Sequence, residues 1–159
     1  MAVINSKTAA RIAAIQALYQ FEMNGRIDKI ESLIDNIKKS YLDEDFKEFF
    51  DIPAHVSMKL NNSYCSKLIT NTVENLSTLD EVINAHLVDE WKFSNLHFSL
   101  LALLRVGIAE ILYCVETPRK VIVNEFTNIG ASLAKESEIS FINSLLDKVS
   151  MEYRERNEQ

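Results

Sequence analysis

The first forty residues carry apolar side chains at the spacing of an α-helix. Residues 27–41 show isoleucine and leucine at every third or fourth position, with acidic residues between them. Residues 6–24 are rich in alanine and end at Gly25, and their larger apolar residues form a stripe of Ile12, Ile15, Tyr19 and Met23. Positions i, i+3, i+4 and i+7 lie on one face of a helix, so both segments are predicted to be amphipathic helices. Gly25 favours a helix end between them.

An acidic segment with three phenylalanines follows, "DEDFKEFFDIP" at residues 43–53. Two interpretations fit its five carboxylates: a metal-binding loop, or a solvent-exposed face that the phenylalanines anchor. The segment lacks the glycine and the regular oxygen ligands of an EF-hand loop. The second interpretation is therefore favoured, and Pro53 is expected to end the segment.

The middle of the chain predicts a third helix and then a new start. Residues 54–75 carry apolar residues at helical spacing. Ser77 is a candidate N-cap, with Asp80 three residues later as in a capping box. This start places a boundary near residue 76, between an N-terminal subdomain at 1–76 and a C-terminal subdomain at 77–159. Trp91 lies between two predicted helices and is expected to lock them together.

The last third of the chain predicts three more helices. Residues 95–114 are the most apolar segment, Pro118 suits the first turn of a helix that runs to about Lys135, and residues 137–152 form the last helix. The polar tail that follows is expected to fray. Three glycines and two prolines are too few for the many turns of a β architecture. The fold class is therefore predicted to be all-α, with about seven helices and no strand, in one compact domain.

The charge distribution limits the class of partner. The chain has a net charge of -6, whereas proteins that bind nucleic acids by bulk electrostatics show a basic footprint. The net charge does not exclude a local basic patch. Lys7 and Arg11 lie four residues apart and share a helix face about a quarter-turn from the apolar stripe, so both are expected in solvent. This segment is either the basic arm of an RNA-binding helix or an ordinary amphipathic helix with two cations.

Two charged residues interrupt the apolar run at residues 98–115, namely Arg105 and Glu110. Each costs about 2.5–3.5 kcal/mol near the centre of a bilayer, which predicts a buried helix of a soluble protein rather than a membrane span. A buried arginine needs a carboxylate partner. Glu125 and Glu110 are the candidate partners. The pair would be either a structural clasp between helices or a catalytic pair, and the clasp is favoured because no nucleophile or cofactor motif accompanies it.

The remaining chemistry-bearing residues predict neither an enzyme nor a metal site. Cys65 and Cys114 are expected to be two buried, reduced thiols rather than a disulfide, because a chain of this size needs no covalent link. No signal peptide is evident, so the expected location is cytoplasmic. The glycines form no phosphate-binding loop, and no GxSxG or HExxH motif occurs. The three histidines do not share one helix face at ligand spacing, although a Cys–His pair formed only in space stays open.

Five blocks of sequence, in order and in register, resemble the NusB family of transcription antitermination factors. They are "RIAAIQALYQ" at 11–20, Trp91, "LLRVGIAEIL" at 103–112, "TPRKVIVNE" at 117–125 and "FINSLLDKV" at 141–149. The resemblance covers nearly the whole chain. It implies two packed three-helix-type bundles and a non-catalytic role without a cofactor. It further implies binding to the boxA segment of ribosomal RNA leaders together with the ribosomal protein NusE, in an antitermination complex with RNA polymerase. It implies neither DNA nor a membrane as a partner.

The resemblance also implies which residues contact RNA. Lys7 and Arg11 match basic positions of the family's N-terminal arm, although further arginines common there are replaced by Thr8 and Ala9. The other RNA-binding candidates are Lys120, Phe141 and His86. Phe141 matches an aromatic position that could stack on a base, and a core phenylalanine is an equally fitting interpretation.

On the protein partner's side, Tyr19 matches a family contact to NusE, and Leu100 replaces a position that is commonly acidic. Two other functions stay open. One is a helical protein–protein scaffold that has lost RNA binding. The other is a NusB-like RNA-binding module that acts with a ribosomal RNA methyltransferase.

Overall fold

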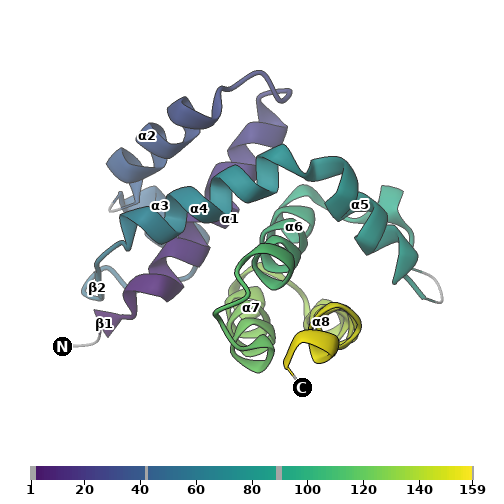
Figure 1. Ribbon diagram of the computed structural model, residues 1–159. Coiled ribbons are helices and arrows are strands. Elements are labelled where there is room, and N and C mark those ends of the chain that lie inside the picture. Colours follow the sequence, from purple (N-terminus) through teal and green to yellow (C-terminus); the bar gives the residue numbers. More distant parts are fainter. Residues whose placement is uncertain (1–2, 42, 89–90, 159) are drawn as a thin grey trace.

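The computed structural model describes residues 3–41, 43–88 and 91–158 (Figure 1). Within these ranges the chain is mostly helical, which confirms the predicted all-α class. The elements in chain order are β1 (Val3–Ile4), α1 (Ser6–Met23), α2 (Ile30–Ser40), α3 (Glu44–Phe49), β2 (Ser57–Met58), α4 (Asn62–Glu74), α5 (Leu76–Ala85), the 3₁₀ turn η1 (Phe93–Asn95), α6 (Phe98–Tyr113), α7 (Arg119–Leu133) and α8 (Glu136–Glu158).

Helix α6 is the centre of the molecule, and it packs against α1, α4, α5, α7 and α8. In Figure 1, α1, α2 and α4 form one group, and α6, α7 and α8 form a second group below it. Every residue of α6 from Leu100 to Ile111 is buried, which explains why this segment is the most apolar of the sequence. Helices α7 and α8 approach closely at Gly130, where an added Cβ would lie 2.8 Å from Cδ1 of Ile142.

Three local predictions were wrong. The third helix begins at Asn62 rather than near residue 54, because the Asn61 side chain accepts a hydrogen bond from the backbone N–H of Tyr64 and caps it there. The residues before it form β2, which pairs in parallel with β1, so a short strand pair exists where none was predicted. The polar tail does not fray at residue 153, since α8 continues to Glu158.

The predicted capping box at Ser77 and Asp80 was also wrong. Helix α5 begins at Leu76 with Asn75 as its N-cap residue, and Arg105 binds the carboxylate of Asp80. The α4–α5 junction at Asn75 lies at the expected subdomain boundary, while the division into residues 1–76 and 77–159 stays a prediction.

Trp91 fastens the segment between α5 and α6 onto α8. Its ring stacks on Phe141 with centroids 4.1 Å apart and planes 14° apart. The expected role of Trp91 in locking its two flanking helices together stays a prediction, because this contact joins the segment to α8 instead. Phe141 is only 7% exposed, so the structure supports its interpretation as a core residue.

Candidate nucleic-acid interface

A groove of about 480 Å³ lies where the N-terminal ends of α1 and α7 meet. We call it the N-terminal groove. A neighbouring hollow extends the groove along α7 and shares Val121 and Glu125 with it. This hollow is lined by Lys120, Val121, Asn124 and Glu125. The groove itself is lined by Asn5, Lys7, Thr8, Arg11, Glu116, Thr117, Pro118, Val121 and Glu125.

Local contacts hold the N-terminal side of this groove in place. Asn5 caps α1, its Oδ1 atom accepting a hydrogen bond of 2.9 Å from the backbone N–H of Lys7. The residues just before it form β1, which pairs with β2, and the backbone N–H of Asn61 donates to the carbonyl of Ser6. The start of α1 is therefore fixed by one segment from later in the chain, residues 57–61, and Lys7 projects from an ordered turn.

Arg11 lies inside the protein, contrary to the prediction that it stays in solvent. It is 2% exposed, and its guanidinium binds Glu110 through Nε–Oε1 (2.8 Å) and Nη2–Oε2 (2.7 Å). Its Nη1 atom donates to Oε1 of Glu125 at 2.6 Å. Arg11 lies one helical turn before Ile15, on the face that α1 turns toward α6. The alanines of α1 are buried as well, so the packed face is wider than the stripe of large residues.

Tyr64 and Thr117 complete this buried cluster. The Tyr64 hydroxyl donates to Oε2 of Glu110 at 2.7 Å and lies 2.9 Å from the hydroxyl of Thr117. Burial raises the pKa of Tyr64, and the negative charge of Glu110 adds to this, so the phenol stays protonated and can donate. Burial acts to lower the pKa of Arg11, but hydrogen bonding and the charge of Glu110 outweigh it and raise that pKa.

The cluster therefore leaves no guanidinium for a phosphate. One arginine faces two carboxylates, and the side chain of Glu125, which is 24% exposed, also accepts a hydrogen bond from the hydroxyl of Thr8. Arg11 serves as a clasp between α1, α6 and α7. The positive charge that the groove presents to solvent must come from other residues.

Lys7 and Lys120 supply that charge. Both are exposed, and neither has a carboxylate within ion-pair distance among the described residues. The Lys7 ammonium lies 5.0 Å from the centre of the Tyr64 ring, in the geometry of a cation–π contact. Other cations near the groove are already paired, Lys67 with Glu116 at 3.0 Å and Arg119 with Asp147 at 3.2 Å.

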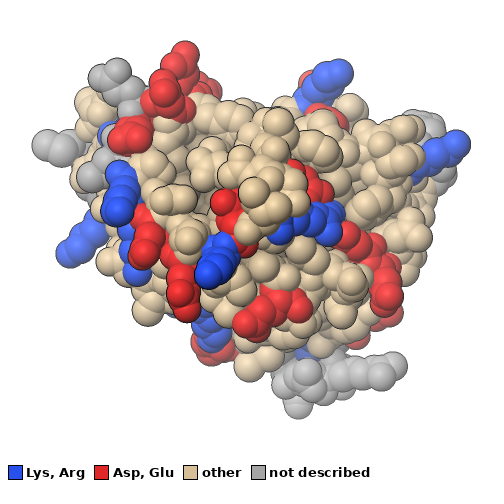
Figure 2. All heavy atoms as spheres, turned by 90° about the horizontal axis from the view of Figure 1, so that it is seen from above, with Lys and Arg blue, Asp and Glu red and all other residues tan. Residues whose placement is uncertain are grey.

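The face drawn in Figure 2 agrees with a molecule of mixed surface charge and a net charge of -6. Lys and Arg side chains are interspersed there with Asp and Glu, and large areas carry neither. Where the residues of this face are described, the picture shows no continuous basic surface.

Arg105 pairs with different acids from those predicted. Its Nε and Nη2 atoms bind the carboxylate of Asp80 at 2.8 and 3.0 Å, and Nη1 lies 3.4 Å from Oε1 of Glu22. The expected pairing with Glu110 or Glu125 was wrong. Arg105 and Glu110 are five positions apart on α6, so their side chains point about 140° apart around the helix. Arg105 was correctly expected to be a buried, paired side chain.

Two of the other RNA-binding candidates lie away from the N-terminal groove. His86 ends α5, with Nδ1 2.8 Å from the carbonyl of Val82 and Nε2 2.5 Å from Glu152. Phe141 is covered by Trp91. Neither residue lines the groove, which brings together only Lys7, Arg11 and, in its extension, Lys120.

The two partner-binding candidates also differ from each other. Leu100 is 2% exposed and packs in the core, so a partner cannot reach it directly. Tyr19 is partly buried, with its ring centre 5.5 Å from that of Phe49 in α3. Tyr19 is thus the accessible member of the predicted pair.

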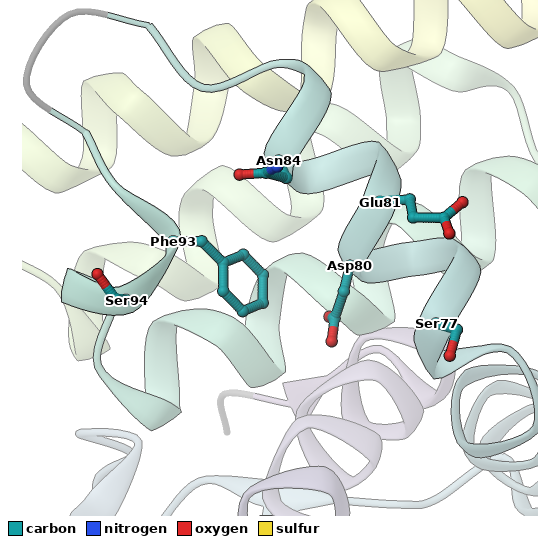
Figure 3. Close-up of a pocket in the computed structure, with 6 residues that line it drawn as sticks. All are labelled: Ser77, Asp80, Glu81, Asn84, Phe93 and Ser94. Carbon is teal, nitrogen blue, oxygen red and sulfur yellow. The ribbon is translucent and has the colours of Figure 1, made fainter.

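A second large hollow, about 700 Å³, lies between α5 and η1 (Figure 3). We call it the α5 groove. Ser77, Asp80, Glu81 and Asn84 come from successive turns of α5. Phe93 points toward them from η1, beside Ser94 (Figure 3). The arrangement combines carboxylates with an aromatic ring, which is chemistry that suits a cationic ligand or a basic protein segment.

The described residues contain no group of three His, Cys, Asp or Glu side chains placed to hold a metal ion. Cys65 and Cys114 are both buried and free, as expected. None of the described helices has the length and hydropathy to cross a bilayer.

Comparisons with known proteins give one consistent result. The sequence matches the NusB family over residues 8–151. It is 40% identical over 149 residues to the transcription antitermination protein NusB of Rickettsia typhi, covering 94% of each chain. It is 37% identical over 150 residues to the NusB of Rickettsia massiliae, again with 94% of each chain covered.

The fold matches two solved structures. A T. maritima NusB superposes with a TM-score of 0.73 at 24% identity, covering 98% of this chain and 96% of that one. A structure of antitermination factors NusB and NusE in complex with dsRNA superposes with a TM-score of 0.68 at 20% identity, covering 93% and 98%. At these identities the two structures establish the shared fold alone.

Proposed function

The chain belongs to the NusB family, and we propose on this basis that it is a non-enzymatic transcription antitermination factor that binds RNA. The proposed RNA is the boxA segment of a ribosomal RNA leader, and the proposed protein partner is NusE. The complex would act on RNA polymerase during transcription of ribosomal operons. The observation that carries the RNA-binding proposal is the open groove between the N-terminal ends of α1 and α7, with Lys7 and Lys120 exposed at it.

The groove suits a phosphate backbone in two ways. Helix N-termini present backbone N–H groups and the positive end of the helix dipole, both of which favour anions. Lys7 and Lys120 add two full charges. Arg11 contributes indirectly, because its ion pairs to Glu110 and Glu125 hold the two helices that form the groove. His86 and Phe141 have no part in this proposal, since both are engaged elsewhere.

The surface around the α5 groove is the second candidate site, for a protein partner. Glu81 of α5 is exposed and has no ion pair among the described residues. The carboxylates of Asp80 and Glu22 beside it are held by Arg105, and Glu22 also by Arg26. Tyr19 lies one turn before Glu22 on α1. A basic partner would be attracted here and would offset the net charge of -6, which repels RNA at long range. We therefore propose that NusE and RNA bind together more tightly than RNA binds alone.

Fluorescence anisotropy with labelled boxA RNA tests this proposal, with and without purified NusE. The test variant is Lys7→Ala/Lys120→Ala. The control is Lys29→Ala/Lys39→Ala, which removes the same charge from exposed positions at α2. We expect weak binding that NusE strengthens, and a loss only in the test variant. Equal effects of both variants would contradict the groove as the RNA site.

The same titration, repeated with ribosomal RNA from outside boxA, separates the two other functions. A protein scaffold would bind NusE and leave the RNA anisotropy unchanged at all concentrations. A module that serves a methyltransferase would bind ribosomal RNA outside boxA at least as well as boxA itself.

A further inference from the structure

A smaller hollow of about 350 Å³ lies between the second half of α1 and the short helix α3. We call it the α1–α3 hollow. It is separate from both the N-terminal groove and the α5 groove, and its lining shares no residue with either. The lining residues are Gln16, Tyr19, Gln20, Ser40, Asp43, Asp45, Phe46 and Phe49.

Aromatic rings form one wall of this hollow. Phe46 and Phe50 are buried with ring centres 5.1 Å apart, and they anchor α3 to the core. Phe49 packs edge-on against Phe50 at 5.0 Å and lies 5.5 Å from Tyr19. Phe49 is itself 37% exposed. Tyr19 and Phe49 therefore present aromatic surface to a ligand from a well-packed base.

The backbone that carries this wall is also fixed. The ammonium of Lys47 in α3 donates hydrogen bonds to the carbonyls of Ala54 and Val56, at 3.2 and 2.9 Å. These bonds close the turn that follows α3. The hollow is thus preformed, and a ligand need not order α3 in order to bind.

Three acceptors of the hollow have no partner among the described residues, namely the carboxylates of Asp43 and Asp45 and the amide oxygen of Gln16. Asp43 and Asp45 are exposed, and neither forms an ion pair with a described residue. Oε1 of Gln16 is buried and has no hydrogen-bond partner. A buried acceptor without a donor is unfavourable. No hydrogen bond of the described residues satisfies this amide oxygen, and Gln16 lines the hollow, so a donor bound there would supply the missing partner.

This set of groups selects a cation with several N–H donors. An aromatic face attracts a cation, and carboxylates bind a guanidinium through paired hydrogen bonds. A guanidinium also stacks on aromatic rings and offers five donors, whereas an ammonium is a compact charge. The two carboxylates would repel the phosphates of RNA. The chemistry of the hollow therefore favours a protein segment over a nucleic acid.

We propose that the α1–α3 hollow binds an arginine side chain of a basic protein partner. The guanidinium would lie against Tyr19 and Phe49, pair with Asp43 or Asp45, and donate to the amide oxygen of Gln16. Because Tyr19 also belongs to the proposed NusE surface, this inference rests on the proposed function for the identity of the partner. The chemistry of the site does not depend on the proposed function.

The first test measures NusE affinity by isothermal titration calorimetry. Asp43→Asn/Asp45→Asn keeps the shape of the hollow and removes its charge, and Phe49→Leu removes the exposed ring. The control, Glu31→Gln/Asp35→Asn, removes the same charge from exposed positions of α2. We expect both test variants to weaken NusE binding about tenfold or more and the control to change it less than about twofold. Unchanged NusE affinity in both test variants would overturn the proposal. Weaker RNA binding with unchanged NusE affinity would also overturn it.

The second test separates this proposal from the proposed function. The probe is the capped tripeptide Gly-Arg-Gly, and its neutral match carries citrulline in place of arginine. NMR spectra of the labelled full chain should show shifts at Tyr19 and Phe49 with the arginine peptide alone, and none in Asp43→Asn/Asp45→Asn. If the chain fails to bind NusE yet gives these shifts, the proposed function fails and the hollow stands. Equal shifts with both peptides, or none with either, would overturn the hollow as an arginine site.

Discussion

Arg11 and Glu110 form a buried, bidentate ion pair that joins the first helix of the chain to the central one. The two hydrogen bonds measure 2.8 and 2.7 Å, and the exposed fractions of the two residues are 2% and 0%. Glu125 and Tyr64 bind the same pair from α7 and α4. The cluster thus connects four helices directly beneath the N-terminal groove, and the shape of that groove depends on it.

Removing Arg11 should destabilise the fold. Arg11→Met leaves Glu110 buried without its cation, and breaking a buried pair in this way costs about 3–5 kcal/mol. The measurement is the free energy of unfolding in urea. Lys7→Met is the matched control, because Lys7 is exposed and its loss should cost less than about 1 kcal/mol. Equal stability of Arg11→Met and the wild type would show that the clasp does not form.

The partner of Arg105 can be identified by double-mutant cycles. Arg105→Met and Asp80→Asn should couple by at least about 1 kcal/mol, since the two residues share two hydrogen bonds. Arg105→Met and Glu125→Gln should add within about 0.5 kcal/mol, because they belong to separate clusters. Coupling to Glu125 instead of Asp80 would restore the pairing expected from the sequence alone.

The hydroxyl of Tyr64 should contribute to stability through the same buried cluster. Tyr64→Phe removes the donor to Glu110 and the contact to Thr117, which should cost about 1–3 kcal/mol. Tyr113→Phe is a suitable control, because no hydrogen bond joins the Tyr113 hydroxyl to the described residues. Thermal unfolding of both variants measures the difference. A similar melting temperature for the two would exclude an energetic role for the Tyr64 hydroxyl.

Buried Cys65 should make stability fall at high pH. Burial raises the pKa of its thiol from 9.0 to about 12. The unfolded chain then loses this proton at a lower pH than the folded chain, so the stabilisation is complete below pH 9 and declines as the pH rises toward 12. Urea unfolding across this range should show a steeper decline for the wild type than for Cys65→Ala. Parallel declines would contradict a buried neutral thiol.

Most of the helices were predictable because local spacing determines them, although α3 and the start of α4 were not. The stripes of α1 and α2 and the apolar run of α6 need no knowledge of distant residues. The strand pair β1–β2 has only two residues on each side and joins segments more than fifty residues apart, so no local pattern could reveal it.

The candidate site was less predictable, for two physical reasons. Alanine packs on any side of a helix, so the Ala-rich α1 gave little information on which face is buried, and Arg11 was placed in solvent. The partners of a buried charge are set by the packing of distant helices. Arg11 and Arg105 each meet an acid that lies tens of residues away, and the sequence offered several acids without a basis for choosing among them.

The salt dependence of RNA binding tests the central claim most directly, namely that Lys7 and Lys120 carry the phosphate contacts while Arg11 is structural. For single-stranded RNA, the logarithm of affinity falls by about 0.7 per neutralised phosphate for each unit in the logarithm of salt concentration. Two cations give a slope of about -1.4 for the isolated chain with boxA RNA, and Lys7→Ala/Lys120→Ala should bring it close to zero. A slope steeper than about -4, or a double variant that binds as the wild type does, would contradict the account.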